Sequence, residues 1–254
     1  QLADDLQDQQ TLKAKLLSAS LYPAIVSAIA LLIVIFLLST VVPQVAQVFS
    51  GGQKKLPALT VAMLALSDFV RMHGWTVALL LLLSALGFTQ AMKRPHLRIQ
   101  FDAAFLRLPV IGRLATGYNT ARFASTLAML TAAGVPILKA MQSAADTLSN
   151  QAMREDVLDA LVLVREGAPL AMAMGQKKRF PGLLAMFARL GEQTGQLPVM
   201  LQRAAQQLSA DVQRRALALA TVLEPLLIVL MGAVVMLIVL AVLMPIMELN
   251  QWVR

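Results

Sequence analysis

The sequence predicts an all-α integral membrane protein with three transmembrane helices and an antiparallel cytoplasmic bundle of about six helices. The first observation is composition. Hydrophobic residues make up 58% of the 254 residues and charged residues 14%, whereas soluble domains average about 45–50% and 25%. The second is three long uncharged apolar runs. The third is the segment between the last two runs, where glycine and proline interrupt helical patterns and no strand alternation occurs.

The three apolar runs predict the spans. The first two lie at residues 21–42 and 75–92, and the third lies between Glu224 and Glu248, within a span that we place at residues 222–247. Crossing the hydrocarbon core takes about 20 apolar residues in a helix, with a lower limit of about 17. Each run meets that limit, so we expect each to cross the membrane. The span boundaries are marked by Pro23, Pro43, Glu224, Pro225 and Pro245.

The distribution of Lys and Arg predicts the topology. Close to the span ends, eight basic residues lie on one side of the membrane and four on the other. Basic residues near span ends favour the cytoplasmic side. This places residues 1–20 and 93–221 in the cytoplasm, and the connector 43–74 and the tail 248–254 on the periplasmic side.

The periplasmic connector contains one amphipathic stretch. Residues 57–71 predict a helix on the outer membrane interface, with Leu59, Met63, Leu66 and Val70 facing lipid. A plain connector without such a helix is the alternative.

Glycine and proline divide the cytoplasmic segment into helices. Gly134 is expected to end one helix in the left-handed conformation, and Pro136 to start the next. Gly191 to Gly195 is expected to interrupt or close another. Pro198 begins a long amphipathic helix to about residue 221, and no breaker separates it from Pro225. We therefore expect this helix to continue into the third span.

A weak internal repeat relates the two ends of the chain. Residues 2–43 align without gaps with residues 204–245, so that Pro23 pairs with Pro225 and Pro43 with Pro245. In such a repeat, residues 1–20 are the last helix of a first cytoplasmic bundle. The expectation is then an N-terminally truncated chain, with most of that first bundle missing before Gln1.

The sequence predicts no catalytic, cofactor or metal site. It contains no cysteine and two histidines, His73 and His96, which the topology puts on opposite sides of the membrane. It has no phosphate-binding loop with the Gly-x-x-x-x-Gly-Lys-Ser/Thr pattern. We therefore expect no enzyme. The spans also lack the internal ionisable residues typical of transporters, so a small-solute transporter is retained only as an alternative from another class.

Several short motifs resemble the type II secretion system F family along the whole chain. They are Leu21-Tyr22-Pro23, Val42-Pro43, Leu66-Ser67-Asp68-Phe69, Tyr118-Asn119-Thr120-Ala121-Arg122-Phe123-Ala124, Gly134-Val135-Pro136-Ile137-Leu138-Lys139-Ala140, Arg165-Glu166-Gly167, Phe180-Pro181, Gly191-Glu192-Gln193-Thr194-Gly195-Gln196-Leu197, Leu223-Glu224-Pro225-Leu226 and Pro245-Ile246-Met247-Glu248-Leu249-Asn250-Gln251.

The resemblance implies a non-enzymatic platform protein of the bacterial inner membrane, with two homologous cytoplasmic bundles and three spans. It implies that the protein couples a cytoplasmic secretion ATPase to pseudopilus assembly and protein export. Implied partners are that ATPase, other inner-membrane platform subunits, pilin-like subunits and the lipid bilayer; we also expect a homo-oligomer. A type IV pilus assembly platform is the alternative within the same family.

Two polar motifs are candidate contact sites. Glu192 lies between Gly191 and Gly195, and its carboxylate is expected either to cap a neighbouring helix or to contact a moving partner. The basic run of Lys177, Lys178 and Arg179 is either a solvated loop or a docking patch for anionic lipid or an acidic partner surface. No aromatic residues are interleaved with it, so nucleic acid is not expected as a partner.

Two further arginines, Arg214 and Arg215, precede the third span by one to two turns. We expect them to lie among the lipid headgroups and to hold the helix at a fixed depth.

Overall fold

A computed structural model describes residues 21, 24–41, 43–44 and 58–252, and all of its regular structure there is helical. The chain divides into two compact units. The apolar unit is described over residues 21–44 and 58–88, apart from the gaps named, and over 219–252. The bundle unit is described over residues 89–218. The all-α membrane fold predicted from the sequence is confirmed, because three helices are long and apolar enough to cross a bilayer.

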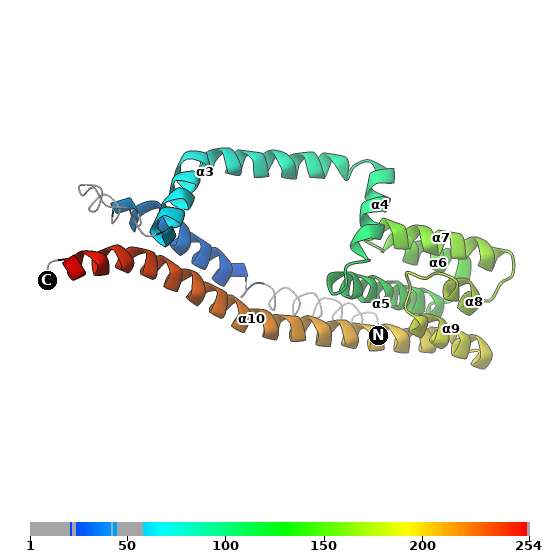
Figure 1. The fold of residues 1–254 in the computed structure, drawn as a ribbon. Coiled ribbons are helices and arrows are strands. Elements are labelled where there is room, and N and C mark those ends of the chain that lie inside the picture. Colours follow the sequence, from blue (N-terminus) through cyan, green and yellow to red (C-terminus); the bar gives the residue numbers. More distant parts are fainter. Residues whose placement is uncertain (1–20, 22–23, 42, 45–57, 253–254) are drawn as a thin grey trace. The chain divides into compact units, whose positions relative to one another are not determined.

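The apolar unit contains the first of those helices, the second up to residue 88, and the third from residue 219 on. The first is Ala24–Val41, which widens to a π-helix over Leu37–Val41. The second is α3, Ala58–Ala91. The third is the C-terminal part of α10, Leu197–Trp252 (Figure 1). Pro43 lies in a short helical stretch, whereas Pro23 lies outside the described residues.

Helix α3 differs from the expected arrangement of a short interfacial helix followed by a separate span. It is one helix of 34 residues that covers both segments. Its first half carries two buried hydroxyls: Ser67 Oγ donates to the carbonyl of Leu38 at 2.5 Å, and Thr60 Oγ1 donates to the carbonyl of Ala241 at 2.8 Å. In an apolar environment such bonds are favoured because an unpaired hydroxyl is costly there.

The expectation that Met63 faces lipid is wrong. Met63 packs with Leu38 and Ile238 in a small apolar cluster of the apolar unit. Leu66, by contrast, is exposed as expected. Periodicity identified the apolar residues but could not show that this half of α3 has helical neighbours.

Over its described residues, 89–218, the bundle unit contains the end of α3, six complete helices and the start of α10. The six helices are α4 (Pro95–Phe105), α5 (Ile111–Ala132), α6 (Ile137–Asp146), α7 (Gln151–Arg165), α8 (Leu170–Gly175) and α9 (Gly182–Thr194). Their apolar faces meet in one core, which includes Phe123, Leu127, Met141, Met153, Leu184 and Leu201. Phe123 and Phe180 meet edge to face with ring centroids 5.8 Å apart, an arrangement that aromatic pairs prefer.

The helix ends follow the predicted glycine and proline signals. Gly134 and Gly195 are left-handed, with φ of 78° and 70°, after α5 and α9. Pro136 is the residue that precedes α6, one position before the expected first turn. Gly191, however, lies within α9. A Cβ on Gly191 would lie 2.7 Å from Leu197 Cα, so this glycine allows α9 to approach the start of α10 closely.

Candidate partner-contact surface

Glu192 is positioned by the last turns of α9, and its carboxylate points back to the start of α8. Its two oxygens accept hydrogen bonds from the backbone N–H groups of Leu170, at 2.5 Å, and Ala171, at 3.4 Å. The first N–H groups of a helix have no acceptor within that helix, and a carboxylate at this end is favoured by the helix dipole. The geometry therefore matches the capping role considered for Glu192. Contact with a moving partner stays a hypothesis.

The basic run lies in the loop between α8 and α9, and two of its three residues are tied to α7. Lys177 Nζ is 3.1 Å from Asp159 Oδ2, and Arg179 Nη1 is 2.8 Å from Asp156 Oδ1. Arg179 also donates to the carbonyl of Ala152 at 3.4 Å. These contacts link the loop to α7.

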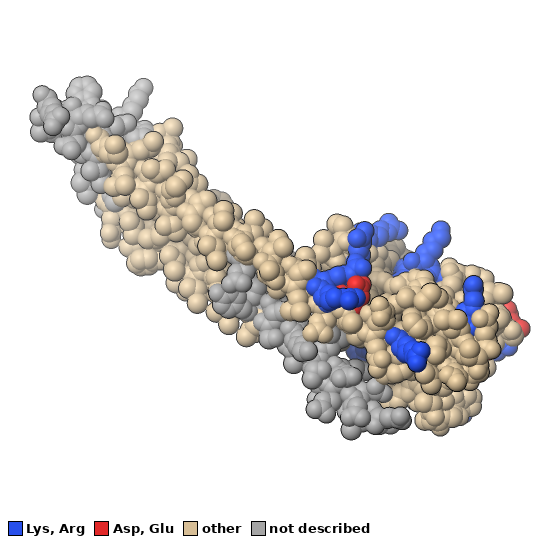
Figure 2. All heavy atoms as spheres, turned by 90° about the horizontal axis from the view of Figure 1, so that it is seen from below, with Lys and Arg blue, Asp and Glu red and all other residues tan. Residues whose placement is uncertain are grey.

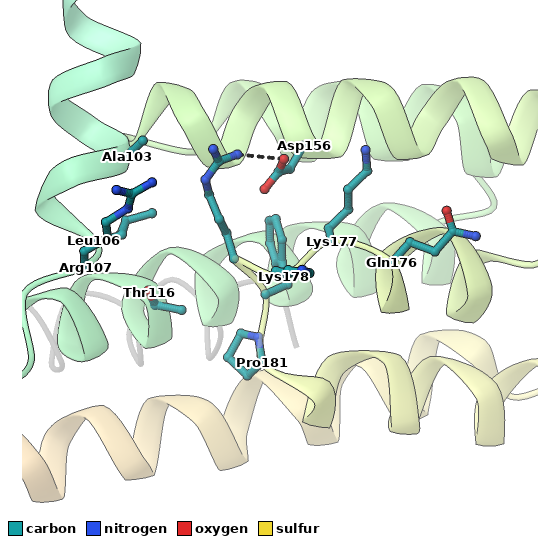
Figure 3. Close-up of a pocket in the computed structure, with 11 residues that line it drawn as sticks. Ala103, Leu106, Arg107, Thr116, Asp156, Gln176, Lys177, Lys178 and Pro181 are labelled. Carbon is teal, nitrogen blue, oxygen red and sulfur yellow. Dashed lines mark hydrogen bonds and ion pairs between the residues drawn. The ribbon is translucent and has the colours of Figure 1, made fainter.

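This loop forms one wall of an open pocket of about 750 Å³. The other walls come from α4, α5 and α7. Figure 3 shows the ion pair to Asp156 as a dashed line, with Arg107 on the α4 side of the pocket. The full lining is Ala103, Leu106, Arg107, Thr116, Asp156, Gln176, Lys177, Lys178, Arg179, Phe180 and Pro181.

The pocket has an excess of positive charge. Four basic side chains line it against the single carboxylate of Asp156. Lys178 is exposed, and within the described ranges it has no ion pair. A concave surface of one charge concentrates ions of the opposite charge. Such a surface is chemically suited to a carboxylate or phosphate group.

Positive charge is a general property of the visible bundle surface. Figure 2 shows Lys and Arg in several groups over it, with few Asp or Glu among them. The apolar unit carries no blue or red side chain on this face. On this face the visible charged side chains therefore belong to the bundle unit, whereas the apolar unit carries its exposed charges, Asp68 and Arg71, elsewhere.

The other candidate residues lie in turns or within helices. Gly134 and Pro136 form the α5–α6 turn, which packs Val135 against the bundle core. Glu224, Pro225 and Pro245 all lie within the bounds of α10, so neither proline ends the helix. Among the described residues, none of these five lines a pocket together with Glu192 or the basic run. In that part of the chain no group of three or more His, Cys, Asp or Glu is placed to hold a metal ion.

Sequence inspection missed Arg107 and the two acidic partners on α7. Asp156 and Asp159 are three residues apart, which places them on one face of a helix. That spacing was the only available signal, and it does not reveal which basic residues lie opposite. Arg107 is about 70 positions from the loop it faces and carries no local signature.

Among protein families, the sequence model of the family described as type II secretion system (T2SS), protein F, matches residues 1–43 and 123–245 of the chain. The chain belongs to the type II secretion system protein F family. The two matched segments end at Pro43 and Pro245, the prolines that the internal repeat pairs.

Similar proteins come from both branches of this family. The chain is 38% identical over all of its length to type II secretion system protein F of Pseudomonas aeruginosa, and 38% identical over 98% to that of Vibrio cholerae. It is also 35% identical over 98% to the type IV pilus assembly protein PilC of Thermus thermophilus. The chain spans 62%, 61% and 61% of these relatives, respectively. It is a membrane protein of a family shared by secretion and pilus platforms.

Proposed function

We propose that this chain acts in a non-enzymatic inner-membrane platform of a type II secretion system. In this proposal the bundle unit lies in the cytoplasm and the three apolar helices cross the membrane. The platform couples a cytoplasmic secretion ATPase to assembly of pilin-like subunits and to protein export. Other platform subunits and a second copy of the chain are the further partners. Membership of the secretion family and the three apolar helices support the proposal.

The observation that carries the coupling mechanism is the length of α10. One helix of 56 residues contributes Leu201 to the bundle core and Ile238 to the apolar cluster. An α-helix is stiff along its axis, because each turn is hydrogen-bonded to the next. A force applied to the bundle by a partner would therefore reach the apolar segment through α10 itself.

The partner is expected to bind at the pocket of about 750 Å³ beside the α8–α9 loop, which we call the basic pocket. Its excess of positive charge favours an acidic partner surface, and the ion pairs of Lys177 and Arg179 hold its loop against α7. Complementary charge speeds association and selects the partner. Lys178 and Arg107 are the exposed residues that we expect to contact it.

Deletion of the gene in its host, complemented with the full-length gene, tests the biological role. Exported protein in the medium and pili on the cell surface are scored in parallel. We expect loss of exported protein with pili intact. Loss of pili alone would assign the chain to pilus assembly, which the similarity to PilC supports. If neither changes and no paralogue substitutes, the platform proposal is wrong, and solute flux in proteoliposomes would test transport.

A helix-softening variant tests the mechanism separately. Ala218→Gly with Ala220→Gly costs α10 about 2 kcal/mol of helix propensity, and the matched Ala218→Ser with Ala220→Ser costs about half as much. We expect export to fall much further in the glycine pair while both proteins reach the membrane in equal amounts. Equal export in the two pairs, or crosslinks showing a free hinge over residues 215–230 in the wild type, would refute transmission through α10.

A further inference from the structure

A second pocket lies beside the first and is lined by arginines from two elements. It measures about 330 Å³ and shares Leu106, Thr116 and Pro181 with the first. Its basic residues are Arg113 from the first turn of α5, and Arg214 and Arg215 from α10. We call the pocket formed by these three residues and by Asp211, which also lies on α10, the arginine pocket.

The arginine pocket has more positive charge than its single carboxylate can balance. Arg215 Nε is 2.8 Å from Asp211 Oδ2, whereas Arg214 Nη2 is 3.8 Å from Asp211 Oδ1. Arg113 has no ion pair within the described part of the chain. Three guanidinium groups thus face one carboxylate, which leaves two positive charges unbalanced and favours a further anion. The planar fork of arginine matches the oxygens of phosphate in a bidentate arrangement.

Both walls of the pocket continue into exposed apolar surface. On α10, Leu217 follows Arg215 by two residues within the bundle unit and is 46% exposed. On the other wall, Leu108, Val110 and Ile111 lie between the lining residues Leu106 and Arg113 and are 45%, 45% and 53% exposed. Arginines next to exposed apolar side chains are typical of segments at a membrane interface, where the apolar groups enter the lipid and the cations stay at the headgroups.

The position of Arg214 and Arg215 in the sequence agrees with a location at the lipid headgroups. The uncharged run of α10 begins directly after Arg215 and is interrupted before Glu248 only by Glu224. At a rise of about 1.5 Å per residue, Glu224 is about 14 Å along the helix from Arg215. Arg214 and Arg215 are thus the last basic residues of α10 before its long apolar run, a position typical of cations that stay at the headgroups. An acidic protein surface would match the charge but not the apolar rims.

We propose that the arginine pocket binds the phosphate of an anionic phospholipid headgroup, with Arg113 and Arg214 as the principal donors. The exposed apolar residues on both walls contact the acyl chains nearest that headgroup. The site ties the bundle unit to anionic lipid. This inference is independent of which machine the protein serves, so it stands or fails separately from the proposed function.

The test measures lipid retained by the intact purified chain in neutral detergent, by native mass spectrometry during titration with phosphatidylglycerol or phosphatidylcholine. Arg113→Gln with Arg214→Gln removes the guanidinium group that has no described ion pair and the one with the longer ion pair to Asp211. Each basic residue near an anionic lipid contributes about a fivefold gain in affinity, so we expect about 10- to 30-fold weaker phosphatidylglycerol binding. The control, Lys139→Gln with Arg165→Gln, removes the same charge from exposed positions outside both pockets and should bind like the wild type.

Three outcomes would overturn the proposal. One is equal retention of the two lipids by the wild type. Another is the same loss in the control pair as in the pocket pair, which would reduce the effect to net charge. The last is displacement of phosphatidylglycerol by inorganic phosphate or a polyglutamate peptide at equal concentration, which would make this a site for small anions or acidic protein. If the double variant unfolds, Arg113→Gln alone, which breaks no described ion pair, should still weaken binding about fivefold.

Discussion

Replacing Glu192 by alanine should open the start of α8 without unfolding the bundle. The amide hydrogens of Leu170 and Ala171 lie in the first turn of that helix, and their described acceptors are the two carboxylate oxygens of Glu192. Loss of a capping side chain costs about 1 kcal/mol. Bonds to a carboxylate are worth about 1.5–3 kcal/mol when buried, but Glu192 is exposed, so water recovers part of this. We take about 1 kcal/mol, which corresponds to about a fivefold rise in local opening.

Hydrogen–deuterium exchange of the intact protein in detergent measures this opening directly. A peptide covering residues 168–175 should exchange about fivefold faster in Glu192→Ala, and Glu192→Gln should lie between it and the wild type because one oxygen acceptor remains. The control is Glu155→Ala, which removes an exposed carboxylate from α7 that makes no described bond. Unchanged exchange in Glu192→Ala would refute the capping argument. Lost export with unchanged exchange would instead support a partner contact at Glu192.

Three further predictions concern the packing of the bundle. Gly191→Ala should destabilise the protein by about 1–3 kcal/mol, because its Cβ would meet the backbone of Leu197 at 2.7 Å, whereas Gly182→Ala has open space and should be neutral; thermal unfolding in detergent compares them. Asn119→Ala should cost about 1–3 kcal/mol, because its Oδ1 accepts hydrogen bonds from the N–H groups of residues 149 and 150, and exchange of that turn should accelerate. Phe123→Ala should cost about 3–5 kcal/mol by leaving a core cavity, and a midpoint of thermal unfolding equal to that of the wild type would contradict it.

The elements set by local chemistry could be predicted from the sequence. Gly134 and Gly195 adopt the left-handed conformation, which glycine enters without the steric cost of a Cβ. The first and third apolar runs lie in long helices because their composition already meets the requirement of a bilayer. The absence of a breaker between Pro198 and Pro225 predicted one helix there, and α10 is continuous.

The break between α6 and α7 was not predicted, because its stabilising contacts are distant in sequence. Asn150 caps α7 by accepting the N–H of Met153, and it donates to the carbonyl of Asp102 at 3.1 Å. Asn119, in the middle of α5, accepts from the same turn. Single asparagines at these positions have no periodic signature, so only the packed helices show why they are there.

For the candidate contact surfaces, too, the sequence predicted some features and only the structure showed the others. The sequence identified the basic run and Glu192 by type and flanking glycines, because charge and backbone freedom are properties of the residues themselves. It could not assign Lys177 and Arg179 to their carboxylates on α7, or bring Arg113 beside Arg214. Those pairings depend on the packing of helices many residues apart.

The sequence alone thus determined the class of this protein: its apolar runs, helix ends and charge asymmetry are local quantities that no tertiary contact can reverse. Only the tertiary structure decided which charges are neutralised and which stay available, because the strength of an ion pair depends on a distance of a few ångströms that local sequence does not contain.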